Sequence, residues 1–81
     1  MPVQLTLYSR AGCHLCEDMH TLLQSFSKDL EFSVDVVDID QEPALHRRYN
    51  TLVPVLVLGE REICHYFLDK VALCKALGKP I

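Results

Sequence analysis

The chain has 81 residues, of which 49% are hydrophobic and 23% are charged, and its formal net charge at pH 7 is −3. This length fits a single domain, residues 1–81, and the composition is that of a folded globular protein rather than a disordered one. No apolar run is long enough to cross a bilayer, the first residues lack the layout of a signal peptide, and no basic stripe favours nucleic acid. We therefore expect a cytoplasmic protein with neither nucleic-acid nor membrane partners.

The first half of the chain predicts a strand, a helix and a second strand. Residues 3–8 are an apolar, β-favouring run. From residue 14 to residue 30, apolar side chains recur at the spacing of one helix face. Residues 31–39 then alternate between apolar and polar side chains, which is typical of a strand with one covered face. Its inward side is predicted to hold Phe32, Val34 and Val36, with Ile39 as a further candidate.

A short helix and a hairpin are predicted next. Asp40 is expected to cap the helix, which ends at Tyr49. Residues 55–58 are continuously apolar, as in a strand covered on both faces, and a tight turn leads from them to a strand over residues 61–66.

The last predicted helix covers residues 70–77, with Asp69 as its N-cap and Gly78 after its end. The element order is therefore β-α-β-α-β-β-α. The first strand, helix and second strand make a right-handed unit with parallel strands. We expect an α/β three-layer sandwich with a mixed four-stranded sheet, in which the first and third helices cover one face and the second helix covers the other.

Cys13-His14-Leu15-Cys16 is the most informative motif, because it follows a strand and opens a helix. Only a thiolate attacks a disulfide, and the unpaired N–H groups at a helix N-terminus stabilise that anion at Cys13. His14 and Arg10 could add positive charge. Cys16 lies one turn further on, where we expect it to be more buried and to resolve a mixed disulfide. The pattern favours thiol-disulfide exchange.

Other uses of the same cysteines remain open at this point. Cys13, Cys16, His20 and a distant Cys64 offer the nitrogen and sulfur ligands that zinc prefers, but nothing in the sequence fixes the fourth ligand. The same fold could also hold an iron–sulfur cluster through Cys13 or act as a redox-inert adaptor. Cys64 and Cys74 lie in apolar surroundings and are expected to pack as small hydrophobes.

These features together resemble the glutaredoxin branch of the thioredoxin superfamily. Residues 8–10 are followed two residues later by Cys-x-x-Cys, Val53-Pro54 opens a strand, and Gly59 stands at a hairpin turn. Residues 13–19 look most like the small glutaredoxin-like proteins whose cellular role is poorly defined. The resemblance covers essentially the whole chain and implies the thioredoxin-like, glutaredoxin-type fold.

The resemblance also implies roles for individual residues. Cys13 would be the nucleophile and Cys16 the resolving thiol, with no organic cofactor bound permanently. The substrate-binding candidates would be Arg10 in place of a glutaredoxin lysine, Pro54 as a cis proline, and Val53, whose backbone N–H and C=O would pair with a peptide-like substrate. His14 is a further candidate because it lies beside the nucleophile. Protein disulfides or glutathione as co-substrate are the expected partners of a monomer.

Two departures from the glutaredoxin pattern concern the substrate. His14 and Leu15 replace the proline and tyrosine that usually separate the two cysteines. Residues 64–67, Cys-His-Tyr-Phe, stand where glutaredoxins carry a Gly-Gly pair followed by acidic residues that help to hold glutathione.

Overall fold

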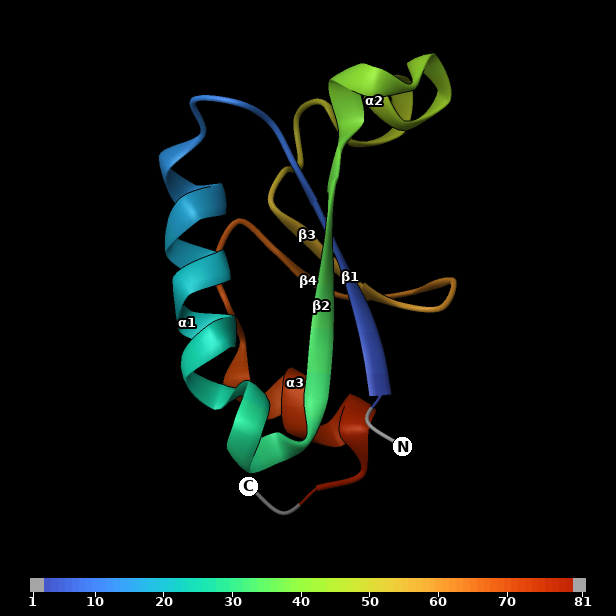
Figure 1. Ribbon diagram of the computed structural model, residues 1–81. Coiled ribbons are helices and arrows are strands. Elements are labelled where there is room, and N and C mark those ends of the chain that lie inside the picture. The colour runs from blue at the N-terminus through green and yellow to red at the C-terminus, as the bar shows by residue number, and fades with distance from the viewer. Residues whose placement is uncertain (1–2, 80–81) are drawn as a thin grey trace.

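The computed structural model describes residues 3–79 of the chain. Its helices and strands follow the predicted order, with one 3-10 turn added after the second strand (Figure 1). The elements are β1 (Val3–Ser9), α1 (His14–Leu30), β2 (Phe32–Asp38), the 3-10 turn η1 (Ile39–Gln41), α2 (Pro43–Tyr49), β3 (Val55–Leu58), β4 (Arg61–His65) and α3 (Lys70–Leu77).

The strands form one mixed four-stranded sheet in the order β2-β1-β3-β4. β1 pairs with β2 in parallel, from Val3 opposite Phe32 to Ser9 opposite Asp38. β3 runs antiparallel to β1, with Val55 opposite Tyr8, and also antiparallel to β4. The loop that follows β1 and the segment that precedes β3 therefore lie at the same end of the sheet.

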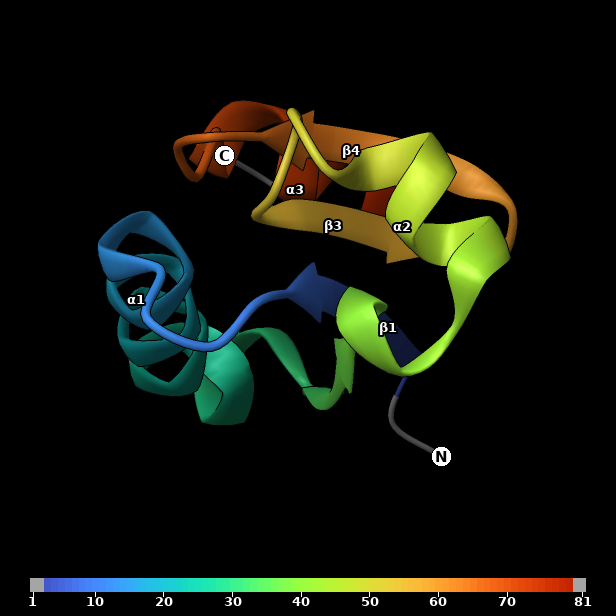
Figure 2. The ribbon, with the colours of Figure 1, turned by 90° about the horizontal axis from the view of Figure 1, so that it is seen from above.

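Three layers are formed because the side chains of each strand alternate between two covered faces. Leu5 and Leu7 of β1 are fully buried against α1 and α3, in a cluster with Met19, Leu23, Phe32, Leu56 and Leu73. A smaller cluster lies on the opposite face under α2 and contains Ile39, Tyr49, Val55 and Val57. In the view from above, the sheet lies between α1 and α2, as predicted (Figure 2).

The two ends of α3 carry the capping residues that the sequence predicts. The Asp69 carboxylate accepts a hydrogen bond from the Ala72 N–H at 3.0 Å, which satisfies one of the free donors of the first turn. After the last turn, Gly78 adopts φ +69, a left-handed conformation that favours glycine. Both predictions are confirmed.

Three local predictions are wrong. Asp40 does not cap α2: Asp38 caps the 3-10 turn by accepting the Asp40 N–H at 2.9 Å, and Glu42 precedes α2 without a side-chain cap. Ile39 does not belong to the inward side of β2: it lies in the 3-10 turn and is buried in the smaller cluster on the opposite face. Val36 does lie on the predicted side, in register with Leu7, although it is 45% exposed on this edge strand. β4 ends at His65 rather than Tyr66, because Tyr66 turns the backbone to φ +64.

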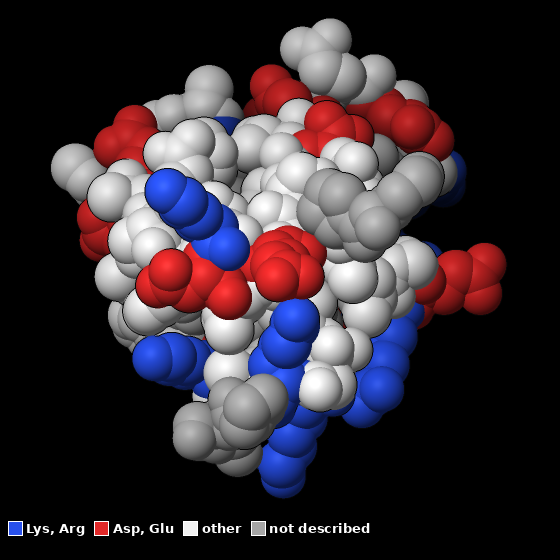
Figure 3. Space-filling view, turned by 60° about the horizontal axis from the view of Figure 1, so that its bottom comes forward, with Lys and Arg blue, Asp and Glu red and all other residues white. Residues whose placement is uncertain are grey.

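The surface of the molecule carries both signs of charge. The face opposite the loop after β1 shows acidic and basic side chains beside one another near its centre (Figure 3). Among residues 3–79, no helix has both the length and the apolar character needed to span a membrane.

Candidate functional site

Cys13 occupies the N-cap of α1, at the end of the sheet where β1 stops. Its Sγ accepts a hydrogen bond from the Cys16 N–H at 3.2 Å, and its carbonyl accepts the first helical bond from the Glu17 N–H at 3.1 Å. Gly12, with φ +75, turns the chain from β1 into this cap. The sequence folds this way because a short loop with glycine in a left-handed conformation joins the strand to the helix. Cys13 is partly exposed, and its sulfur binds one of the N–H groups that the first turn of a helix leaves without a helical partner.

Cys16 lies directly behind Cys13 and is only 4% exposed. The two cysteines form a disulfide, with their Cα atoms 5.2 Å apart. Beneath Cys16, a groove of about 160 Å³ runs between α1 and the ends of β1 and β2, and Arg10, Glu17 and His20 also line it. The arrangement gives the dithiol one accessible sulfur and one protected sulfur.

Val53 and Pro54 stand at the same end of the sheet, just before β3. Their peptide bond is cis, and Pro54 is buried. The Pro54 carbonyl accepts the Tyr66 N–H at 2.9 Å, and the Val53 N–H donates to the Tyr49 carbonyl at 3.1 Å. The resemblance implies that both backbone groups of Val53 pair with substrate. In this structure its N–H is already engaged, so its carbonyl is the remaining group for that purpose.

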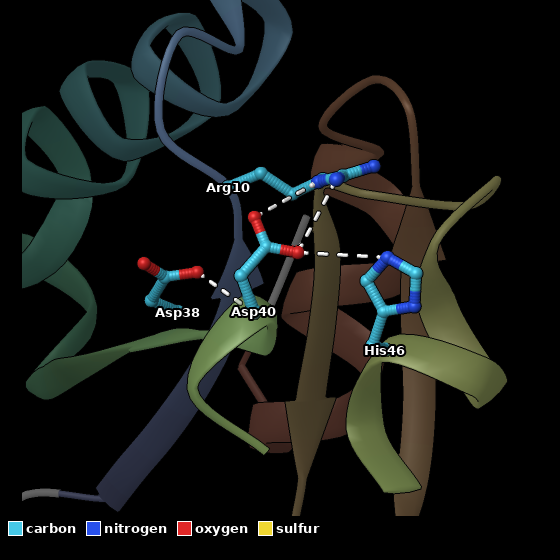
Figure 4. Close-up of polar contacts among 4 residues, drawn as sticks. All are labelled: Arg10, Asp38, Asp40 and His46. Carbon is cyan, nitrogen blue, oxygen red and sulfur yellow. Dashed lines mark hydrogen bonds and ion pairs between the residues drawn. The ribbon is translucent and has the colours of Figure 1, made fainter. Parts of the chain in front are cut away.

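Arg10 lies in the loop after β1, but its charge is paired. Its Nε and Nη2 reach the two Asp40 carboxylate oxygens, at 3.3 and 3.2 Å, and His46 Nε2 approaches the same carboxylate at 3.6 Å (Figure 4). Asp40 extends from the 3-10 turn and His46 from α2, so three segments meet here. The positive charge expected beside the dithiol is therefore largely neutralised by Asp40. His14 is exposed on the first turn of α1.

The two cysteines outside the motif, Cys64 and Cys74, pack against the core. Cys64 packs against the larger core cluster, and Cys74 is 1% exposed within α3, which confirms that both pack as small hydrophobes. Burial raises the pKa of the Cys64 thiol; the Asp69 and Glu62 charges add to this, and a backbone hydrogen bond at Asp69 opposes it. Cys64 is therefore protonated at neutral pH and is a poor nucleophile.

Of the possible zinc ligands, only His20 shares a groove with Cys16. Within residues 3–79, no three histidine, cysteine, aspartate or glutamate side chains are grouped as ligands of a metal ion.

Two residues that shape this end of the sheet were missed by sequence reasoning. Asp40 holds Arg10 from thirty positions away. The Tyr66 hydroxyl donates to the Thr51 carbonyl at 2.6 Å, which fixes the loop after β4 against the segment before Pro54. Neither contact has a local signal in the sequence, because each joins segments that only the sheet brings together.

Comparison with known proteins agrees with this geometry. The family described as "Glutaredoxin-like domain (DUF836)" matches residues 4–78. The chain belongs to this glutaredoxin-like family. The match bears out the predicted resemblance to glutaredoxin-like proteins.

Individual relatives cover most of the chain. The solution structure of protein Ne2328 from Nitrosomonas europaea is 42% identical, with a TM-score of 0.84, and the match covers 94% of this chain and 92% of that one. An uncharacterized protein of Mycobacterium tuberculosis is 29% identical over an alignment of 72 residues, and the match covers 83% of this chain and 74% of that protein. Buckwheat glutaredoxin, solved in complex with glutathione, is 23% identical with a TM-score of 0.55, over 93% of this chain and 70% of that one. The fold is thus thioredoxin-like and of the glutaredoxin type.

Proposed function

We propose that this protein is a thiol-disulfide oxidoreductase in which Cys13 attacks and Cys16 resolves. The observation that carries the proposal is the asymmetry of the two sulfurs: Cys13 is the half-exposed N-cap that accepts a backbone N–H, whereas Cys16 is 4% exposed behind it. A thiolate at the first position is stabilised by the helix N-terminus, and a thiol at the second is shielded from competing reagents.

The reaction follows from these roles. The reduced protein begins with a Cys13 thiolate and a Cys16 thiol. The thiolate attacks one sulfur of the substrate disulfide, the substrate S–S bond breaks, and one substrate thiolate leaves. Cys16 then loses its proton and attacks the Cys13 sulfur, which releases the second substrate thiolate and forms the Cys13–Cys16 disulfide. The substrate gains two electrons. Two equivalents of an external thiol then reduce the Cys13–Cys16 disulfide back to the dithiol and are themselves joined as a disulfide.

Substrate and location are parts of the same proposal. Protein disulfides or glutathione mixed disulfides supply the oxidised partner, and a thiol such as glutathione supplies the electrons. Exchange in this direction suits a reducing compartment such as the cytoplasm. Pairing of a substrate backbone with the Val53 carbonyl would orient the disulfide at Cys13.

Two serine variants test the assignment. Cys13→Ser should abolish exchange, because the thiolate that begins the reaction is gone. Cys16→Ser should retain a single turnover and accumulate a mixed disulfide on Cys13. The measurement is the intact mass of the reduced Cys16→Ser protein after brief exposure to oxidised glutathione, with peptide mapping of the adduct. Equal loss of reactivity in both variants would contradict the assigned roles.

A further inference from the structure

A shallow apolar groove lies beside the dithiol and is not used by the exchange reaction itself. One wall is α1, which contributes Leu15, Met19 and Leu22, and the other wall is the loop after β4, which contributes Tyr66, Phe67 and Leu68. Three of the five large hydrophobic side chains that are exposed on the described surface belong to this groove: Leu22 at 47%, Tyr66 at 39% and Phe67 at 71%. Apolar side chains gathered in this way mark a binding surface more often than isolated ones do.

The groove begins at the reactive motif. Leu15 lies between Cys13 and Cys16, and Leu22 lies two turns further along the same helix, so the α1 wall extends about 10 Å away from the dithiol. A molecule whose disulfide reaches Cys13 therefore lies next to the groove. Because the groove adjoins the dithiol, we expect its occupant to be a part of the substrate whose disulfide reacts with Cys13.

The wall formed by Tyr66 is fixed before any substrate binds. Its N–H donates to the Pro54 carbonyl at 2.9 Å, and its hydroxyl donates to the Thr51 carbonyl at 2.6 Å. These two bonds hold Tyr66 in its left-handed conformation against the segment that precedes β3. A wall that is already ordered reduces the entropy lost when a side chain enters the groove.

The size and charge of the groove indicate which kind of side chain would fit it. Its volume is about 180 Å³, and an apolar cavity of roughly 150 Å³ accommodates a benzene molecule. Asp18 is the one charged side chain that lines it, and no cation within residues 3–79 forms an ion pair with Asp18. A bulky apolar side chain next to a lysine or arginine complements both features. Glutathione has a net negative charge at neutral pH and no bulky apolar side chain, so it complements neither.

We propose that the groove formed by Leu15, Asp18, Leu22, Tyr66 and Phe67 selects protein disulfides whose reacting cysteine is flanked by a bulky apolar residue and a basic residue. The inference rests on the proposed exchange reaction and names its substrate class. Because the Val53 N–H is engaged with Tyr49, backbone pairing supplies less of the recognition, and the side-chain groove supplies the discrimination.

The test uses the reduced Cys16→Ser protein and short peptides whose cysteine is carried as a mixed disulfide with thionitrobenzoate. This coloured thiol is the better leaving group, so its release reports attack by Cys13. One peptide flanks the cysteine with lysine and phenylalanine, a second with glutamate and phenylalanine, and a third with two glycines. The thionitrobenzoate disulfide of glutathione is the reference for basal reactivity.

We expect the lysine and phenylalanine peptide to react about tenfold faster than the glycine peptide and the glutathione reference, from burial of one apolar side chain. Phe67→Ser should lower the rate of the lysine and phenylalanine peptide to that of the glycine peptide, and Leu22→Ser on the other wall provides a second variant. Val71→Ser is the matched control, because Val71 is 45% exposed but does not line the groove. Asp18→Asn should reduce the preference for lysine over glutamate by about twofold to fivefold.

The outcomes separate this inference from the function on which it rests. Equal rates for all four probes, or a preference that survives both Phe67→Ser and Leu22→Ser, would overturn the groove as a selective site while leaving Cys13 as a working nucleophile. No release from any probe by folded protein would overturn the exchange reaction, and the substrate class with it.

Discussion

Replacing Cys13 by alanine or by serine separates its role as a helix cap from its role in redox chemistry. Its Sγ accepts the Cys16 N–H at 3.2 Å. Both replacements remove the nucleophile, but a serine hydroxyl can still accept this bond, whereas alanine leaves the N–H without a side-chain partner. Loss of an N-cap acceptor costs about 1 kcal/mol of stability. Under reducing conditions we therefore expect Cys13→Ala to be less stable than Cys13→Ser by about that amount.

The difference is measurable because α1 unfolds with the core of the domain. Met19 and Leu23 of α1 are buried in the larger cluster, so weakening the start of the helix should lower the stability of the whole fold. For a domain of this size, 1 kcal/mol corresponds to a shift in Tm of about 4–8 °C. Thermal unfolding followed by circular dichroism, with reductant present, would show it.

Ser25→Ala is the control, because it removes a hydroxyl from an exposed position within the same helix. It should change Tm by less than the difference between the two Cys13 variants. Equal Tm values for Cys13→Ala and Cys13→Ser would refute the capping role, and with it the claim that the same N–H stabilises the Cys13 thiolate.

Two further predictions concern charge. Asp40→Asn should leave the Arg10 charge unpaired and stabilise the reduced dithiol, raising its reduction potential by about 5–20 mV, the range of an exposed charge interaction; equilibration with a glutathione redox buffer measures this. Asp38→Asn makes the same charge change without an Arg10 contact, so an equal shift in both variants would point to net charge alone. Because the Cys64 pKa is raised above 9.0 by burial, the folded protein holds this proton longer than the unfolded chain, and stability should fall as pH rises above about 9. Urea unfolding across that pH range should show a smaller fall in the free energy of unfolding for Cys64→Ala than for wild type. An equal dependence on pH in the two proteins would argue against the raised Cys64 pKa.

Much of the fold and the centre of the candidate site could be predicted from local sequence patterns. Three of these patterns depend only on residues a few positions apart, so the order of residues reveals them. They are the helical spacing of apolar residues that begins at His14, the Asp69 N-cap, and Gly78 at the end of the last helix. The Cys13 to Cys16 motif is also local, since its chemistry depends on its place at the start of a helix. The prediction that Asp40 caps α2 was wrong because Asp38 and Asp40 are both of a residue type that caps helices. The pairing of β2 with β1 ends at Asp38, which caps the 3-10 turn, and Asp40 lies within that turn.

What the sequence determined by itself is therefore the element order, the dithiol and the more accessible of its two sulfurs. The tertiary structure alone decided the surroundings of that dithiol: the pairing of Arg10 with Asp40, the engaged N–H of Val53, and the groove bounded by Tyr66. Each of these contacts depends on which loops meet at one end of the sheet. That meeting is set by the register of β1 against both β2 and β3, a property of packing between segments far apart in the chain, which no local pattern encodes.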